Sequence, residues 1–322
     1  MRRSTIPSIF SVLALLAIIV TPALAQYPNR PIRMIVPFAT GSATDTSARL
    51  YAVELSKQIG QQVVPDNRAG AGGAIGMQAL VRAAPDGYTI AYAGAGPLAI
   101  NRSVTPNLPY DVEKEVQAIS QAVSSPLFLA ISPALPVKSV KELIALAKAK
   151  PGQLANGSAG AGTVGHLAGE YFKILSGTDI LHVPYKGGAQ AATDAISGFV
   201  QVLFDPASSI APYIRSGRLR GLAVTGAKRS KAFPELPTVA EAGVPGYEVT
   251  TWGGMIAPVG VPRAIVTRLS EEMQKAAKSA FVTERTAPLG AEPVASTPEE
   301  FTALIQREFT KWATVIKRVG PK

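Results

Sequence analysis

The feature of this sequence that most constrains its fold is a series of strand, small-residue loop and helix patterns that occurs twice. The first series begins with the apolar stretch 31–38 and passes through the loop 39–45 into a helical pattern. The second passes through the loop 157–163 into another helical pattern. In both series the next strand ends in Val-Pro, at residues 64–65 and 183–184. Strands that alternate with helices form parallel sheets covered on both faces, so two series predict two α/β lobes.

A chain that builds two lobes must cross between them, and two apolar stretches suit that role. Residues 125–132 are predicted to carry the chain into the second lobe, and residues 251–258 to return it to the first. The first lobe then comprises residues 26–126 and 250–322, and the second comprises residues 127–249. An amphipathic pattern near the C-terminus predicts a long helix that packs on the first lobe.

The first 25 residues have the three regions of a secretory signal peptide in order. Residues 2–3 are arginines, residues 9–20 form a short apolar run, and residues 23–25 are Ala-Leu-Ala, so cleavage is expected before Gln26. The alternative is a membrane anchor, but the apolar run is shorter than the ~20 residues that span a bilayer. We therefore expect export of the mature chain to the periplasm, with release into the medium as an alternative.

Composition narrows the chemistry of the mature chain. The 322 residues include no cysteine, which excludes disulfides, thiolate metal sites and a cysteine nucleophile. No segment after residue 25 is apolar over the length of a membrane span, so a soluble protein is expected. The two histidines, His166 and His182, have no acidic partner at ligand spacing, so no metal site is predicted.

The charge of the chain favours small anions over nucleic acid. The formal net charge is +10, of which the signal peptide carries two positive charges, and a positive field attracts anions. The basic residues are dispersed, the densest cluster being 228–231, and no stripe of aromatic and basic residues accompanies them. Small acidic ligands or an acidic partner protein are therefore the expected partners, and nucleic acid is not.

The second loop contains the pattern G-x-G-x-x-G, at Gly160, Gly162 and Gly165. In a dinucleotide fold an acid at the end of the second strand holds the ribose. Here that strand ends in residues 183–186, which include no acid, and Asp179 lies at the opposite end. The sequence therefore predicts no bound cofactor.

The same loop can still bind an anion, because N–H groups at a helix start and the helix dipole favour negative charge. Hydroxyls of Ser158 and Thr163 add donors, and the first lobe has a similar loop at residues 40–44. Both loops follow strands, so both are expected at the edge where open parallel sheets bind ligands. The alternative for each loop is a plain turn whose hydroxyl caps the helix.

The ordered motifs resemble those of the Bug-type receptors, the periplasmic solute-binding components of tripartite tricarboxylate transporters. The matching stretches are residues 27–32, 36–45, 67–73, 85–89, 108–111, 158–169, 182–187, 204–205, 222–225 and 237–243. They cover nearly the whole mature chain. The resemblance implies a two-lobed, periplasmic binding protein-like (type II) fold, with parallel-rich sheets flanked by helices and a ligand cleft between the lobes.

The resemblance also implies the binding residues. In such receptors a ligand carboxylate is gripped between the two loops by backbone N–H groups, hydroxyls and ordered water. The implied ligand-binding residues are Thr40, Gly41, Ser42, Thr44 and Asp45 in the first loop, Ser158, Ala159, Gly160, Gly162, Thr163 and His166 in the second, and Asp205 after a second-lobe strand.

Some of these residues have a purely structural alternative. His166 can cap or pack against its helix, and Asp45 can be a first-turn acid that favours its own helix dipole. Asp205 can accept a ligand ammonium or hydroxyl, or orient a neighbouring loop. Trp252 can flank the hinge or pack in the core. The chain departs from the family pattern at Ser42, Ala161, Val164, Gly165 and Pro206, which leaves the rest of the ligand open, with Val164 favouring a partly apolar one.

The sequence thus predicts a non-catalytic, monomeric receptor that captures a small carboxylate in the periplasm and delivers it to membrane transporter subunits. Delivery to a sensor protein is an alternative partner. The alternative class is an exported hydrolase or other enzyme acting on a small acid in the same cleft. Against it, no G-x-S-x-G motif exists, and Ser158 and His166 around one helix start are poorly arranged for proton transfer.

Overall fold

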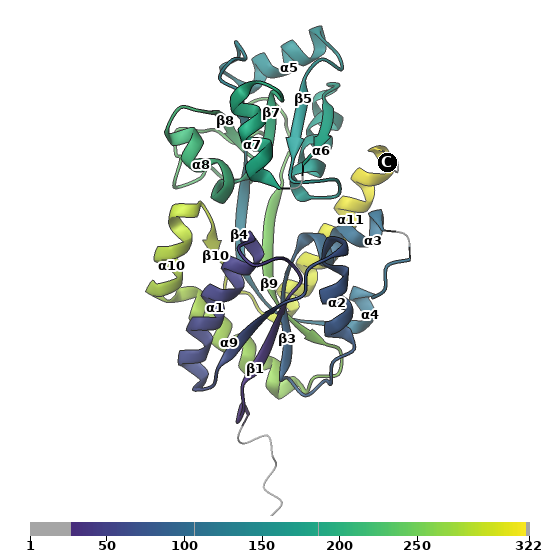
Figure 1. Cartoon of the computed structure of the whole chain (residues 1–322), viewed down its shortest axis with the longest axis vertical. Coiled ribbons are helices and arrows are strands. Elements are labelled where there is room, and N and C mark those ends of the chain that lie inside the picture. The colour runs from purple at the N-terminus through teal and green to yellow at the C-terminus, as the bar shows by residue number, and fades with distance from the viewer. Residues whose placement is uncertain (1–26, 106, 186, 320–322) are drawn as a thin grey trace, which may run out of the picture.

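A computed structural model describes residues 27–319 except residues 106 and 186. The predicted signal peptide, residues 1–25, lies outside the described residues. The chain forms two α/β lobes, one above the other in Figure 1, joined by the long strands β4 (Val116–Ile131) and β9 (Thr250–Pro258). The predicted two-lobed α/β architecture is confirmed.

The first lobe has a mixed sheet in the order β2-β1-β3-β9-β4. Strand β1 (Ile32–Val36) is parallel to β2 (Val63–Asn67) and β3 (Thr89–Gly94), while β9 is antiparallel to β3 and β4. Parallel strands start at the same end of a sheet, so β1 and β3 both end at the edge that faces the second lobe. Strands β1 and β3 are near-continuous apolar runs with consecutive buried residues, which is the pattern of a sheet covered on both faces.

Two buried clusters cover the two faces of this sheet. One joins Tyr51 and Leu55 of α1 (Ala43–Ile59) to Leu269 of α9 (Arg263–Lys278). The other joins Met77 of α2 (Ala74–Val81) to Trp312 of α11 (Pro298–Val319). The remaining elements of this lobe are η3 (Ala71–Gly73), the π-helical turn η4 (Gly96–Ile100), α3 (Asn101–Val104), α4 (Val112–Glu115), α10 (Ala280–Thr286), η5 (Ala287–Leu289) and β10 (Glu292–Pro293).

The second lobe repeats the parallel arrangement on a smaller scale. Strand β5 (Ala155–Ser158) is parallel to β6 (Leu181–Pro184) and to β7 (Val202–Pro206). The other elements of this lobe are α5 (Val140–Ala149), α6 (Val164–Ser176), α7 (Gly188–Ser197), α8 (Ala207–Arg215) and β8 (Arg220–Val224). Strands β5 and β7 end towards the first lobe, so helices α6 and α8, which follow them, start at the gap between the lobes.

Strand β4 belongs to both sheets. Its residues 116–126 pair with β9, and its residues 127–131 pair with β7 and β8. The sequence predicted a crossing strand at residues 125–132 only, and the observed strand starts nine residues earlier because it first runs the length of the first lobe. Helix α11 packs on the first lobe as predicted, and it also contacts α6 of the second lobe.

Candidate functional site

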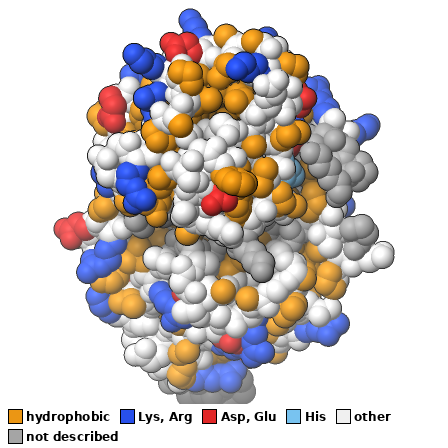
Figure 2. Space-filling model, turned by 45° about the horizontal axis from the view of Figure 1, so that its top comes forward, with side chains coloured by type: hydrophobic (Ala, Val, Ile, Leu, Met, Phe, Trp, Pro, Cys, Tyr) orange, Lys and Arg blue, Asp and Glu red, His pale blue; other side chains and the backbone are white. Residues whose placement is uncertain are grey.

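A cleft with a cavity volume of about 1180 Å³ separates the two lobes. A smaller cavity of about 420 Å³ adjoins it, and both are lined by the start of α1 and by Thr251 and Trp252 of β9. On the face drawn in Figure 2, Lys and Arg side chains are spread around the edges rather than gathered in one patch. The only charged side chains among the described lining residues of the larger cavity are Arg102 and Asp205.

The first loop turns into α1 through a glycine in the left-handed region. Gly41 has φ +83°, a conformation that a side chain would strain. Ser42 then caps the helix, with its hydroxyl accepting the N–H of Asp45 at 3.2 Å. The Asp45 carboxylate reaches back and accepts the N–H of Gly41 at 2.8 Å. These two reciprocal bonds fix the shape of the loop.

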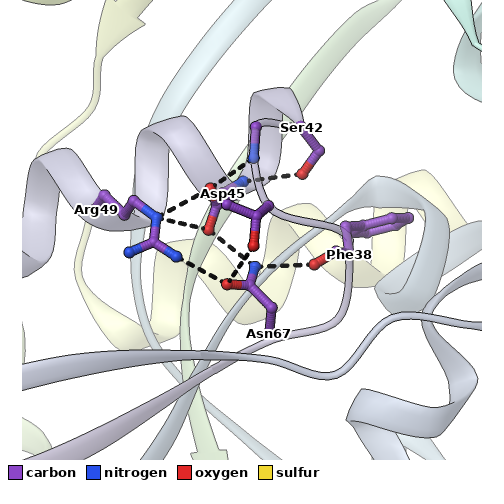
Figure 3. A network of polar contacts seen from close by, with 7 residues as sticks. Phe38, Ser42, Asp45, Arg49 and Asn67 are labelled. Carbon is purple, nitrogen blue, oxygen red and sulfur yellow. Dashed lines mark hydrogen bonds and ion pairs between the residues drawn. The ribbon is translucent and has the colours of Figure 1, made fainter.

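The Asp45 carboxylate is also the centre of a polar network, shown in Figure 3. Asn67 at the end of β2 donates to Asp45 at 2.8 Å and to the Phe38 carbonyl at 2.9 Å, and Arg49 pairs with Asp45 at 3.0 Å. Burial would raise the pKa of Asp45, but the bonds from Arg49, the Gly41 N–H and Asn67 outweigh it and hold this pKa below 3.8. The side chain is only 2% exposed, so its oxygens are directed into the protein.

The second loop follows the same plan. Gly162 has φ +76°, and Thr163 caps α6 by accepting the N–H of His166 at 3.4 Å. The His166 side chain reaches back, and its Nδ1 accepts the N–H of Gly162 at 3.1 Å. Thr163 also donates to the carbonyl of Gly160 at 2.7 Å. In each lobe, therefore, the third residue of the helix holds the glycine that precedes the cap.

A second pair of polar side chains supports this loop from the side of β6. The Ser158 hydroxyl lies 2.7 Å from Nε2 of His182 and accepts the N–H of Gly160 at 3.2 Å. The rings of His166 and His182 stack with centroids 3.8 Å apart. Ser158 is only 2% exposed. Its hydroxyl therefore serves the loop geometry and does not line the cleft.

The two loops leave backbone donors at the cleft. The N–H groups of Ala43 and Thr44 in α1, and of Val164 and Gly165 in α6, form no hydrogen bond with a described residue. All four residues line the larger cavity. First-turn N–H groups have no intrahelical acceptor, and the positive end of the helix dipole lies beside them. The cleft is thus suited to a small anion without a cationic side chain in the loops.

Asp205 lies at the end of β7 and lines the larger cavity. Its side chain is buried, and its Oδ2 has no hydrogen-bond partner among the described residues. Burial raises the pKa of Asp205 to about 7, although a bond from Ser209 lowers it in part. The start of α7 packs so closely that a Cβ on Gly188 would lie 2.4 Å from Oδ2.

The structure separates the predicted site residues into two groups. Those that line the larger cavity are Gly41, Ser42, Thr44, Ala159, Gly162, Thr163, His166 and Asp205. Thr40, Asp45, Ser158 and Gly160 do not line it, and their polar groups hold the loops in place. Whether any of them contacts a ligand stays a prediction.

Sequence reasoning missed further lining residues. Among them are Gly94 at the end of β3, Ala95 and Gly96 after it, Arg102 of α3, Gly187, Gly188 and Ala189 at the start of α7, and Ser209 of α8. The signal that could have found residues 94–96 is the parallel pairing of β3 with β1, which places both strand ends at one edge. Within the described residues, no group of three metal-ligating side chains exists, and none of their helices is long and apolar enough to cross a membrane.

Comparison with known proteins identifies the family. The model of the "Tripartite tricarboxylate transporter family receptor" matches residues 47–320. Protein BugT of Bordetella pertussis is 39% identical over 297 residues, covering 92% of this chain and 91% of that protein. The structure of Rpa4515 from R. palustris with adipate has a TM-score of 0.82 at 37% identity and covers 90% of this chain and 97% of its own.

A second solved structure, that of the periplasmic binding protein BugD, is also similar. It matches with a TM-score of 0.80 at 34% sequence identity, and the match covers 92% of this chain and 99% of the BugD chain. The matches span both lobes and confirm the resemblance predicted from the sequence motifs. The chain therefore belongs to the tripartite tricarboxylate transporter receptors, as a Bug-type member.

Proposed function

We propose that this chain is a non-catalytic, monomeric receptor that binds a small carboxylate between its lobes in the periplasm and delivers it to membrane transporter subunits. The observation that carries the proposal is the pair of helix starts across one cavity. The N–H groups of residues 43–44 and 164–165 supply donors from both lobes to one anion. The adipate held by the R. palustris relative supports a carboxylate as that anion.

The lobe limits predicted from the sequence are part of this proposal. The first lobe would comprise residues 26–126 and 250–322, and the second residues 127–249. The change of pairing along β4 supports them, since Pro126 pairs with β9 whereas Leu127 pairs with β7. A carboxylate bound by N–H groups from both sides would favour the closed arrangement of the lobes, which the transporter would recognise.

The position of Ser158 supports binding without catalysis. Its hydroxyl bonds to His182, but it is buried behind the loop and does not line the cleft. A nucleophile must reach the reacting carbon of a bound substrate, and this hydroxyl lines neither of the two cavities. The hydrolase alternative is thereby disfavoured.

A ligand screen tests the proposal. Purified protein is heated with mono-, di- and tricarboxylates and with amino acids, and hits are confirmed by calorimetric titration. A ligand at one hundred times its Kd stabilises the folded state by about 2.7 kcal/mol, which corresponds to a rise in Tm of several degrees. Recovery of the ligand unchanged after incubation is expected. Turnover of the ligand would support the enzyme instead, and no stabilisation by any carboxylate would overturn the proposal.

A further inference from the structure

Apart from Gly41 and Thr44, the residues that line the smaller cavity are not among those that the sequence motifs assign to the ligand. Its volume is about 420 Å³, and it lies where the first turn of α1 meets Tyr92 of β3, the crossing strands and α8. Gly41, Ala43 and Thr44 line both cavities. A carboxylate held by the N–H groups of Ala43 and Thr44 therefore lies where the two cavities meet, and its substituent can enter the smaller one.

The described lining of this cavity carries no charged side chain. Its polar side chains are the hydroxyls of Thr44, Thr46, Ser47, Tyr92, Ser125, Ser209 and Thr251 and the indole of Trp252. A second carboxylate placed here would lose its hydration without gaining a cationic partner, which is unfavourable. The lining thus favours an uncharged group.

Tyr92 gives the cavity a specific hydrogen-bond donor. Its side chain is 1% exposed, and its hydroxyl has no hydrogen-bond partner among the described residues. The ring belongs to the buried cluster on the α1 face of the sheet, which is the face on which the cavity lies. Burial, with a smaller contribution from Tyr51, raises the pKa of Tyr92 well above its usual value, so the group is a neutral O–H donor. The nearby Ser47 hydroxyl partly opposes this rise, but its geometry does not amount to a hydrogen bond with Tyr92. A buried donor of this kind is stabilised by an acceptor.

We propose that the smaller cavity is a subsite for an uncharged, ring-sized tail of the ligand that presents a hydrogen-bond acceptor to Tyr92. The inference rests on the proposed function, because the carboxylate at α1 directs the tail into this cavity. Cavities of ~150 Å³ bind benzene, so a volume of about 420 Å³ holds a substituted ring. The preferred ligand class is then a monocarboxylate with an uncharged aromatic or cyclic tail.

Three probes and two variants test this subsite in the full mature chain. Calorimetric titration compares benzoate, 4-methoxybenzoate and adipate, which has a second carboxylate. We expect both ring-bearing acids to bind at least ~10-fold more tightly than adipate, since the cavity offers adipate no cation. Tyr92→Phe removes only the hydroxyl and should weaken 4-methoxybenzoate about fivefold, the value of one net hydrogen bond, while leaving benzoate unchanged.

Ala291→Phe fills the cavity from its rim, with Ala291→Ser as the matched control. The Phe variant should weaken both ring-bearing acids at least ~10-fold and adipate less than ~3-fold, whereas the Ser variant changes neither. Tighter binding of adipate, or equal effects of the variants on all three probes, would overturn the subsite alone. The Tyr92→Phe comparison decides the matter if the Ala291→Phe protein does not fold. Failure of every carboxylate to bind would instead overturn the proposed function.

Discussion

Gly162 donates its backbone N–H to Nδ1 of His166 at 3.1 Å, four residues along the chain. The first lobe has the same relationship between Gly41 and Asp45, at 2.8 Å. In a common capping box the third helical residue bonds to the N–H of the cap itself, whereas here it bonds to the residue before the cap. The cap N–H groups of Ser42 and Thr163 bond instead to the carbonyls of Ala39 and Gly160, and the two N–H groups after each cap are left at the cleft. Each loop is thus held in shape without using the donors that an anion needs.

Asp45→Ala should loosen the first loop and weaken carboxylate binding. The substitution leaves the Gly41 N–H, Asn67 and Arg49 without their shared acceptor, and we expect a loss of roughly 1–3 kcal/mol in the free energy of unfolding. Affinity for the best carboxylate should fall about 10-fold in calorimetric titration. Glu54→Ala on the same helix, where the side chain pairs with Lys57, is the control and should change little.

The Asp45 carboxylate should also make the free energy of unfolding depend on pH. The pKa of Asp45 is lower in the folded state than its ordinary value of 3.8, so the ionised form stabilises the fold. This contribution is fully present above about pH 5 and is lost as the pH falls through the folded pKa. Denaturant unfolding of wild type and Asp45→Asn should therefore differ most at pH 7, and the difference in the free energy of unfolding should shrink as the pH falls below 3.8. A constant difference at every pH would contradict the assignment.

Ala43→Pro and Val164→Pro should each remove one backbone N–H that donates to the ligand, while the helix that starts there is kept. Each position is the first of its helix, where proline is well tolerated. The preceding caps, Ser42 and Thr163, have ψ of 160° and 159°, the extended geometry that a residue before proline prefers. We expect each change to weaken carboxylate binding by about 10- to 100-fold, the value of a hydrogen bond to a charged group.

The matched controls for these prolines are Ala43→Ser and Val164→Ala, which keep the N–H. Ala280→Pro at the exposed first position of α10, away from the cleft, reports the effect of proline on a helix start alone, since its cap Ser279 is also extended, with ψ 147°. Unfolding midpoints of all variants without ligand should agree within a few degrees. Equal loss of affinity in the proline variants and the controls would show that the N–H groups do not bind the ligand.

Asp205→Asn should change how stability depends on pH. The pKa of Asp205 is raised to about 7 by burial, so the folded state binds this proton more tightly than the unfolded chain does. Stability from this group is present below about pH 4 and falls as the pH rises to about 7, by on the order of 4 kcal/mol. Asparagine does not titrate, so the free energy of unfolding of Asp205→Asn should lack this fall between pH 4 and 7. Without ligand, the variant should be more stable than the wild type at pH 8. An unchanged profile between pH 4 and 7 would refute the assignment.

Gly188→Ala should disturb Asp205, whereas the neighbouring Gly187→Ala should not. A Cβ on Gly188 would lie 2.4 Å from Asp205 Oδ2, but a Cβ on Gly187 meets nothing within 4 Å. Overpacking at Gly188 should cost roughly 1–3 kcal/mol of unfolding free energy, measured by denaturant titration. The variant should also show a smaller pH slope between pH 4 and 7 because the carboxyl group moves towards solvent. Similar behaviour of both alanine variants would refute the close packing.

The helix starts could be predicted because their signals are local. A glycine, a hydroxyl residue and a helical pattern lie within a few positions of one another in both loops, and Ser42 and Thr163 are the caps in the structure. The network around Asp45 could not be predicted this way. Its partner Asn67 is 22 residues away and reaches the carboxylate only because β2 pairs with β1. The sequence motifs therefore located the loop without showing that Asp45 is directed into the protein.

Strand β4 and the buried Asp205 show a second limit of what could be predicted from the sequence. In β4 the pairing register shifts between Ala118 and Ser120 and again between Gln121 and Val123. These irregularities interrupt the alternation that marks a strand, so only its second half was predicted. The cleft position predicted for Asp205 follows from its place at a strand end. Its burial depends on the packing of Gly188 from a helix that follows a different strand, which no local pattern records.

The way in which β4 and β9 join the lobes has a mechanical consequence. The two strands are hydrogen-bonded to each other at the crossing, where Pro126 lies opposite Thr250. A paired ribbon resists stretching and sliding along its length but bends readily out of its plane. Bending of this ribbon is therefore the rotation of the lobes that we expect to cost least. Helix α11 touches α6 from the side of the first lobe, so any such rotation must also change this second contact between the lobes.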